Sequence, residues 1–107
     1  MKEYTSVRQL TEDLPALALP HRESLRGSDG LFAFALQEGD TYFIRLQEGL
    51  LTVSEHAEAS PVCTVHAKEE DLLAMLAGRL NPAKALLWRK VRLQGNSAAL
   101  LSLLKLL

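Results

Sequence analysis

The segment LFAFALQEGDTYFIRLQEGLLTVSEH, residues 31–56, contains three runs that alternate or are rich in aromatic and branched residues. The three runs are 31–38, 41–47 and 50–56, and the residue pairs between them are Gly39-Asp40 and Glu48-Gly49. Short runs separated by such turn residues are typical of an antiparallel meander. In the middle run Tyr42, Ile44 and Leu46 share one face, so we expect one side of the sheet to be buried.

The sequence before this segment predicts a short helix, and the sequence after it predicts a fourth strand over 61–67. Val7, Leu10 and Leu14 recur at helical spacing behind Thr5 and Ser6, either of which can cap the helix. We expect Pro15 and Pro20 to stop this helix, because proline disrupts a helix interior.

The sequence beyond residue 68 changes to helical spacing. The acids Glu69-Glu70-Asp71 precede a leucine-rich run and favour a helix start, and Gly78 is placed to end that helix. Asn81-Pro82 predicts the cap and first turn of a second short helix. A last strand over 91–94 and a final helix over 98–107, capped by Ser97, complete the expected order.

Four short motifs in this region resemble the sterol carrier protein type 2 domain family. They are EEDLL (69–73), GRLNP (78–82), ALL (85–87) and KVRLQGN (90–96). These are similar to the family's acidic helix start, its Gly-Lys-Leu-Asp-Pro motif, its short apolar helix and its ending Lys-Ile-Lys-Ile-x followed by Gly-Asn or Gly-Asp. The match in element order covers residues 31–107. The chain departs from the pattern at Trp88-Arg89, where the family usually has a small residue and glycine, and at Leu87, where methionine or phenylalanine is common.

The resemblance implies an α+β fold with a twisted antiparallel five-stranded sheet and helices packed on one face. It also implies a tunnel between sheet and helices that holds a sterol, fatty acyl chain, phospholipid or isoprenoid. The 107 residues are 48% hydrophobic and 23% charged, and we expect a single domain over 1–107.

The composition narrows the cellular setting and the partners. One cysteine rules out an intrachain disulfide, and there is no secretory leader or membrane-spanning apolar run, so we expect a soluble cytoplasmic protein. The net charge of −1 argues against a nucleic-acid partner. All 13 acidic residues lie in 1–71, whereas 72–107 contains six basic residues and no acidic one.

No residue pattern predicts catalysis, a metal or a cofactor. Cys63 alternates with Val65 on a strand face that we expect to be buried, so it is interpreted as a small core residue rather than a nucleophile. His56 and His66 lack the spacing of zinc ligands. Glu69, Glu70 and Asp71 are interpreted as helix-start acids. We therefore predict a non-enzymatic domain.

The C-terminal helix carries more leucine than one core-facing stripe needs. It either forms a cavity wall or membrane-facing surface, or packs in a homodimer or on a larger enzyme. Basic residues around Trp88 suit transient contact with an anionic membrane, although a solvated face explains them equally well.

The predicted function is to bind and carry an apolar ligand, with a non-catalytic dimerisation or docking module as the alternative. A third option is an accessory factor that handles a quinone or isoprenoid. The predicted ligand-binding residues are Phe34, Leu36, Ile44, Met75, Leu76, Leu86, Leu87, Trp88, Leu100, Leu103 and Leu104.

Overall fold

The computed structural model describes residues 4–57 and 59–98. In chain order its elements are α1 (Val7–Ala18), the short 3-10 helix η1 (Leu19–His21), α2 (Arg22–Leu25), β1 (Gly30–Leu36), β2 (Thr41–Gln47), β3 (Leu50–Ser54), β4 (Cys63–Ala67), α3 (Glu69–Leu76), α4 (Pro82–Leu87) and β5 (Val91–Gly95). The predicted α+β class and the five predicted strands are confirmed. Almost all of the predicted final helix, 98–107, lies outside the described residues.

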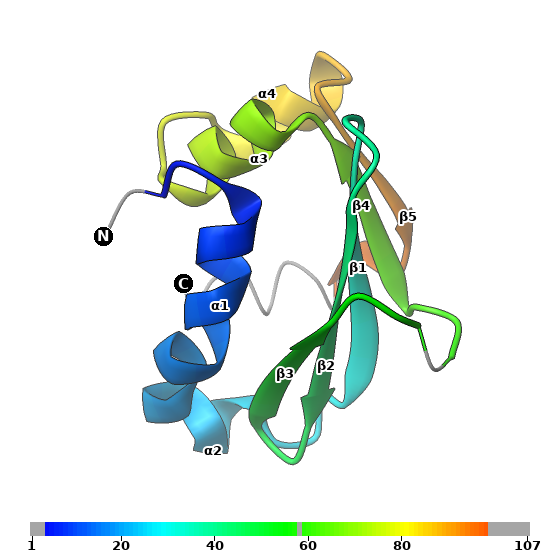
Figure 1. Cartoon of the computed structure of the whole chain (residues 1–107). Helices are drawn as coiled ribbons and strands as arrows, with labels where there is room; N and C mark the ends of the chain where they lie inside the picture. Colours follow the sequence, from blue (N-terminus) through cyan, green and yellow to red (C-terminus); the bar gives the residue numbers. More distant parts are fainter. Residues whose placement is uncertain (1–3, 58, 99–107) are drawn as a thin grey trace.

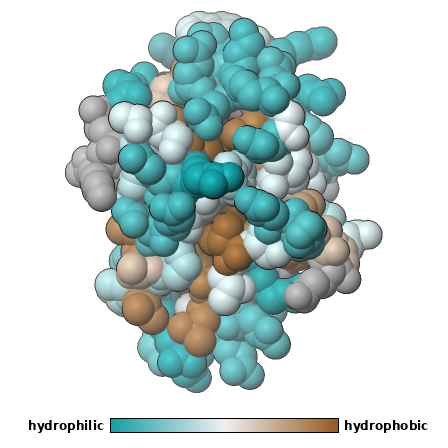
Figure 2. Space-filling model, viewed as in Figure 1, coloured by the Kyte–Doolittle hydropathy of each residue, from teal (hydrophilic) through white to brown (hydrophobic). Residues whose placement is uncertain are grey.

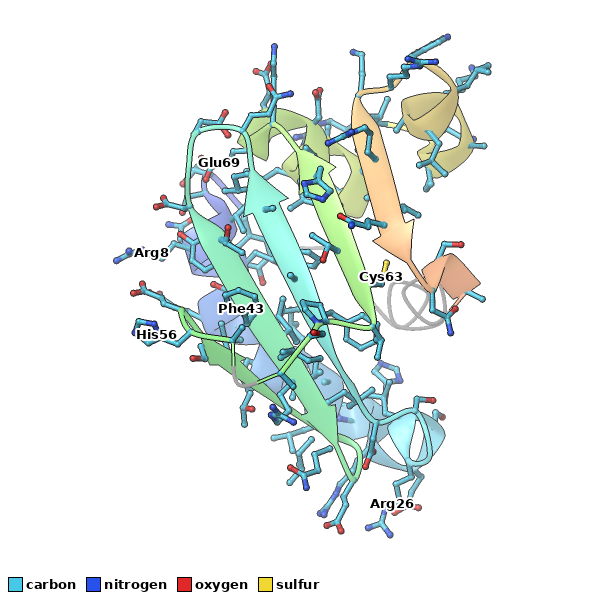
Figure 3. All side chains as sticks on the ribbon, turned by 90° about the vertical axis from the view of Figure 1, so that its right-hand side faces the viewer. Arg8, Arg26, Phe43, His56, Cys63 and Glu69 are labelled. Carbon is cyan, nitrogen blue, oxygen red and sulfur yellow. The ribbon has the colours of Figure 1, made fainter. Side chains whose placement is uncertain are left out.

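The five strands form one sheet in the order β3-β2-β1-β4-β5. Three neighbouring pairs are antiparallel, but β1 and β4 are parallel, so the prediction of a wholly antiparallel sheet is wrong at this pair. The chain leaves β3, crosses the sheet face opposite α1 and enters β4 beside β1 (Figures 1 and 3). This crossover makes β4 run in the same direction as β3 and β1, as parallel strands require.

The β2–β3 hairpin has the tight turn that its sequence predicts. Glu48 and Gly49 have φ angles of 51° and 79°, the left-handed values of both central residues in a type I′ turn. The backbone N–H of Glu48 also donates to Oδ1 of Asp29 at 3.0 Å. The turn therefore joins the strand layer to the segment that follows α2.

In β2 the side chains alternate between the buried and exposed faces of the sheet, as the sequence of residues 41–47 predicts. Tyr42, Ile44 and Leu46 are buried, whereas the intervening residues of β2 are partly or fully exposed. Helix α1 packs over the β3 side of the inner face, and α3 and α4 lie at one end of the sheet (Figure 1). Most of the surface in this view is hydrophilic, with hydrophobic atoms in a band between the helices and the sheet (Figure 2).

Helix α1 begins as predicted and ends later than predicted. Oγ of Ser6 accepts the N–H of Gln9 at 3.2 Å, which caps the helix. The helix nevertheless runs through Pro15 to Ala18, so the expected stop at Pro15 is wrong. Leu14 and Ala18 are each 2% exposed, and their burial on either side of Pro15 offsets the cost of the missing hydrogen bond.

The helix signals around α3 and α4 are confirmed. Glu69, Glu70 and Asp71 form the first turn of α3, and Gly78 follows the helix with a φ of 82°. Oδ1 of Asn81 accepts the N–H groups of Ala83 and Lys84 at 2.8 and 3.4 Å and so caps α4. None of the helices in the described residues is long and apolar enough to cross a membrane.

Candidate ligand-binding site

Four of the predicted ligand-binding residues meet in the interior between the sheet and the helices. Phe34 and Leu36 come from β1, Ile44 from β2 and Met75 from α3. All four are buried and belong to one hydrophobic cluster. Residues that lie far apart in the sequence are thus brought to one apolar region, which we call the interior cluster.

The interior cluster is almost free of polar side chains. Among the described residues Thr11 is the buried polar residue, and its hydroxyl donates to the Arg8 carbonyl oxygen at 2.9 Å. No buried side-chain nitrogen or oxygen in the described part of the chain lacks a hydrogen-bond partner. A ligand with polar groups would lose its hydrogen bonds to water there and find no protein groups to replace them, whereas an apolar ligand has no such bonds to lose.

Glu69 joins three segments at the end of the interior cluster. Its Oε2 accepts the backbone N–H of Val7, at the start of α1, at 3.3 Å. Its own N–H donates to Oε1 of Glu38, in the β1–β2 turn, at 3.2 Å. The sequence indicated a helix-start acid here, but contacts across 62 and 31 residues carry no local signal.

Cys63 lies on the inner face of β4 and is 0% exposed, which confirms its interpretation as a core residue. Burial raises the pKa of its thiol, so the protonated form dominates at neutral pH and nucleophilic reactivity is low. His66 faces β5, where its Nε2 lies 3.1 Å from Oε1 of Gln94. No group of three or more histidine, cysteine, aspartate or glutamate side chains in the described residues is arranged to hold a metal ion.

The structure does not bring the α4 candidates into the interior cluster. Leu86, Leu87 and Trp88 are 41%, 76% and 57% exposed, whereas the neighbouring Ala85 is 0% exposed. Their role as ligand-binding residues stays a prediction. The side chain of Leu76 and the whole of Leu100, Leu103 and Leu104 lie outside the described part of the chain.

Arg89 stands in a backbone conformation that favours glycine. Its φ angle is 57°, and this is the position where the sequence departs from the glycine of the resembling family. We expect Arg89→Gly to raise the free energy of unfolding by about 1 kcal/mol, because the left-handed conformation costs a non-glycine residue that much. Urea denaturation measures the change. Arg92→Gly, in the regular strand β5, is the control and should lower stability instead.

Three surface hollows are lined by described residues, and Tyr42 of the interior cluster lines two of them. One of about 360 Å³ runs between α1 and β3 and is lined by Arg8, Thr11, Tyr42 and Glu55, among others. A second of about 380 Å³ shares Arg8, Tyr42 and Glu55 with it, and a third of about 340 Å³ lies on the opposite sheet face around Phe43. Arg8 pairs with Glu55 at 3.6 Å across the first hollow. These polar groups come from separate elements, so no periodic pattern in the sequence predicts that they meet.

Solved structures share this arrangement of strands and helices. The sec-alkylsulfatase Pisa1 from Pseudomonas sp. superposes with a TM-score of 0.82 at 19% identity over 92% of this chain and 16% of the enzyme. Palmitated SCP2L2 from Aedes aegypti has a TM-score of 0.68 at 24% identity, over 94% of this chain and 93% of that protein. At these identities the likeness establishes the fold.

Sequence comparison extends the likeness to a family. Sterol carrier protein 2 of Gallus gallus is 29% identical over 72 residues, which are 63% of this chain and 13% of that protein. The chain therefore spans a small part of the length of this curated relative. The pattern of the SCP-2 sterol transfer family matches residues 12–107. Because this match extends over most of the chain, the protein belongs to the SCP-2 sterol transfer family.

Proposed function

We propose that this domain binds and carries an apolar ligand, without catalysis, in a tunnel between the sheet and the helices. The observation that carries the proposal is the interior cluster, which offers apolar side chains and almost no polar ones. Membership of the SCP-2 sterol transfer family and the fold shared with palmitated SCP2L2 support it. The ligand classes are sterols, fatty acyl chains, phospholipids and isoprenoids, and we place the protein in the cytoplasm.

Binding in such a site is a transfer of apolar surface out of water. Each buried methylene contributes about 0.8 kcal/mol, so a chain of about fifteen methylenes gains on the order of 12 kcal/mol. Association costs at least about 4 kcal/mol, which leaves a net gain of at most about 8 kcal/mol and an affinity that reaches the micromolar range. Of the residues that the structure describes, we propose that four line the tunnel: Phe34, Leu36, Ile44 and Met75. Leu76 and the leucines at 100, 103 and 104 are proposed to complete it.

Met75 provides a direct test, because the chain has only two methionines, Met1 and Met75. In protein labelled with ¹³C on the methionine methyls, we expect a fatty acid to shift the Met75 signal and to leave Met1 unchanged. The reason is that Met75 is 8% exposed and belongs to the interior cluster. A Met75→Leu variant assigns the two signals. Saturable fatty-acid binding with no change at Met75 would contradict the proposed position of the ligand.

Native mass spectrometry of protein purified from cells separates this function from the dimerisation alternative. A monomer with the added mass of a lipid is expected for a carrier, and extraction identifies the ligand, including a quinone. An empty dimer would instead support a module that closes its leucine-rich surface against a second copy.

A further inference from the structure

Helix α4 buries only a small side chain, that of Ala85, whereas its leucines and the tryptophan that follows it are exposed. Ala85 is 0% exposed, whereas Leu86, Leu87 and Trp88 are 41%, 76% and 57% exposed. Large apolar side chains that gather at the surface of a small domain mark an interaction site more often than isolated ones do. We call residues 84–90, which hold this group, the α4 tip.

Backbone hydrogen bonds hold the α4 tip in one conformation. The N–H of Trp88 donates to the Lys84 carbonyl oxygen at 2.9 Å, and the N–H of Arg89 donates to that of Leu86 at 3.2 Å. The N–H of Lys90 donates to the Ala85 carbonyl oxygen at 2.9 Å. The exposed side chains are therefore presented by a hydrogen-bonded turn that closes the helix.

Basic side chains surround the exposed apolar ones. Lys84, Arg89 and Lys90 are exposed, and Nζ of Lys84 lies 6.0 Å from the centre of the Trp88 ring. The sequence contains no acidic residue from 72 to 107. Figure 3 shows nitrogen-ended side chains gathered around α4, at the upper right of the view. The α4 tip thus has an apolar centre and a cationic rim.

This combination fits the surface of an anionic bilayer. Tryptophan prefers the membrane–water interface, leucine partitions below it, and lysine and arginine reach the phosphates while their stems remain in contact with apolar groups. Nucleic acid fits less well, because it would meet two exposed leucines where stacking platforms are needed.

We propose that the α4 tip docks the protein on a bilayer that contains anionic phospholipids. Leu87 and Trp88 enter the interface, and Lys84, Arg89 and Lys90 contact the headgroup phosphates. This contact goes beyond the proposed ligand binding, which uses the interior cluster. It places α3, whose Met75 faces that cluster, next to a source of apolar ligand.

Trp88 is the only tryptophan of the chain, so its fluorescence reports on the α4 tip alone. Vesicles of phosphatidylcholine mixed with phosphatidylserine are expected to shift its emission to shorter wavelength and to sediment the protein. Pure phosphatidylcholine vesicles should do neither to the same extent, and added salt should weaken the effect. Sedimentation with mixed vesicles and no change in Trp88 emission would place the contact on another surface and overturn the proposal.

Charge variants test the cationic rim. Each basic residue near an anionic bilayer contributes about a fivefold factor to partitioning, so Lys84→Glu combined with Lys90→Glu should reduce vesicle binding at least about 25-fold. Arg26→Glu is the control, because Arg26 is exposed at the opposite end of the sheet from α4 (Figure 3). The double variant changes the net charge by −4 and Arg26→Glu changes it by −2, so an equal loss per unit of charge in both proteins would show that only overall charge matters, and the proposal would fail.

A second pair of variants tests the apolar centre. Leu87→Ser should weaken binding to mixed vesicles about tenfold, through the loss of buried apolar surface. Leu19→Ser removes a leucine that is 56% exposed in η1, beside α2 at the other end of the molecule, and should leave vesicle binding unchanged. If Leu19→Ser weakens vesicle binding as much as Leu87→Ser does, the α4 tip is not the docking surface.

In the variant that combines Lys84→Glu and Lys90→Glu, the Met75 signal recorded without vesicles should still shift when fatty acid is added. Docking and ligand binding can therefore fail separately.

Discussion

Replacement of Gly95 by alanine is expected to lower the free energy of unfolding by more than about 3 kcal/mol. Gly95 ends β5 with a φ angle of 100°, which side chains rarely adopt, and an added Cβ would overlap the carbonyl oxygen of Val62. The same carbonyl oxygen of Val62 accepts a hydrogen bond from the N–H of Asn96 at 2.7 Å. The N–H of Val62 in turn donates to the carbonyl oxygen of Leu31 at 2.7 Å. The substitution therefore strains the point where β5, the crossover and β1 meet.

Gly39→Ala is the matched control for this prediction. Gly39 has a φ angle of 117°, but an added Cβ there meets no atom within 4 Å. Gly39→Ala introduces the backbone strain without the steric overlap, so we expect it to lower the free energy of unfolding by about 1–2 kcal/mol. Urea titration of both variants measures the difference. Equal losses would mean that the close approach to Val62 does not matter.

Phe34→Ala is expected to lower the free energy of unfolding by about 3–5 kcal/mol. Phe34 is 2% exposed in β1, the central strand of the sheet, and its ring is among the largest in the interior cluster. Its removal loses apolar burial and leaves a cavity that the neighbouring strands cannot close. Thermal and urea denaturation of the ligand-free protein measure the effect.

Phe43→Ala is the control for the opposite sheet face. Phe43 belongs to the neighbouring strand β2, is only partly buried, and lies on the outer face in Figure 3. We expect Phe43→Ala to lower the free energy of unfolding much less than Phe34→Ala does, because folding removes less apolar surface from contact with water on that side. Similar losses would indicate that both sheet faces contribute equally to the core.

The local signals of the sequence located most of the elements. Strand alternation around Ile44, the turn at Glu48-Gly49 and the caps Ser6 and Asn81 act over a few residues, and the structure has each of them. The extension of α1 beyond Pro15 was missed, because it depends on the burial of Leu14 and Ala18 against other elements. The parallel β1–β4 pair was missed because strand propensity carries no direction.

The candidate site was predictable in kind and only partly in membership. Phe34, Leu36, Ile44 and Met75 share the interior cluster, as residues of their type commonly do. Leu86, Leu87 and Trp88 have equally apolar side chains but lie at the surface of α4. Composition cannot separate the two groups, because a core, a cavity wall and a docking surface use the same residue types.

The resemblance of four sequence motifs to a family implied the α+β class, and the sequence alone determined the strand and helix order and an interior made of aliphatic and aromatic side chains. These follow from periodicity, turn residues and caps, which act within a few residues of the chain. Only the tertiary structure decided that β4 runs parallel to β1, that Glu69 joins α1 to the β1–β2 turn, and that Ala85 is the residue of α4 that turns inward. Each of these depends on contacts between segments far apart in the chain, and such contacts form only when the elements pack together.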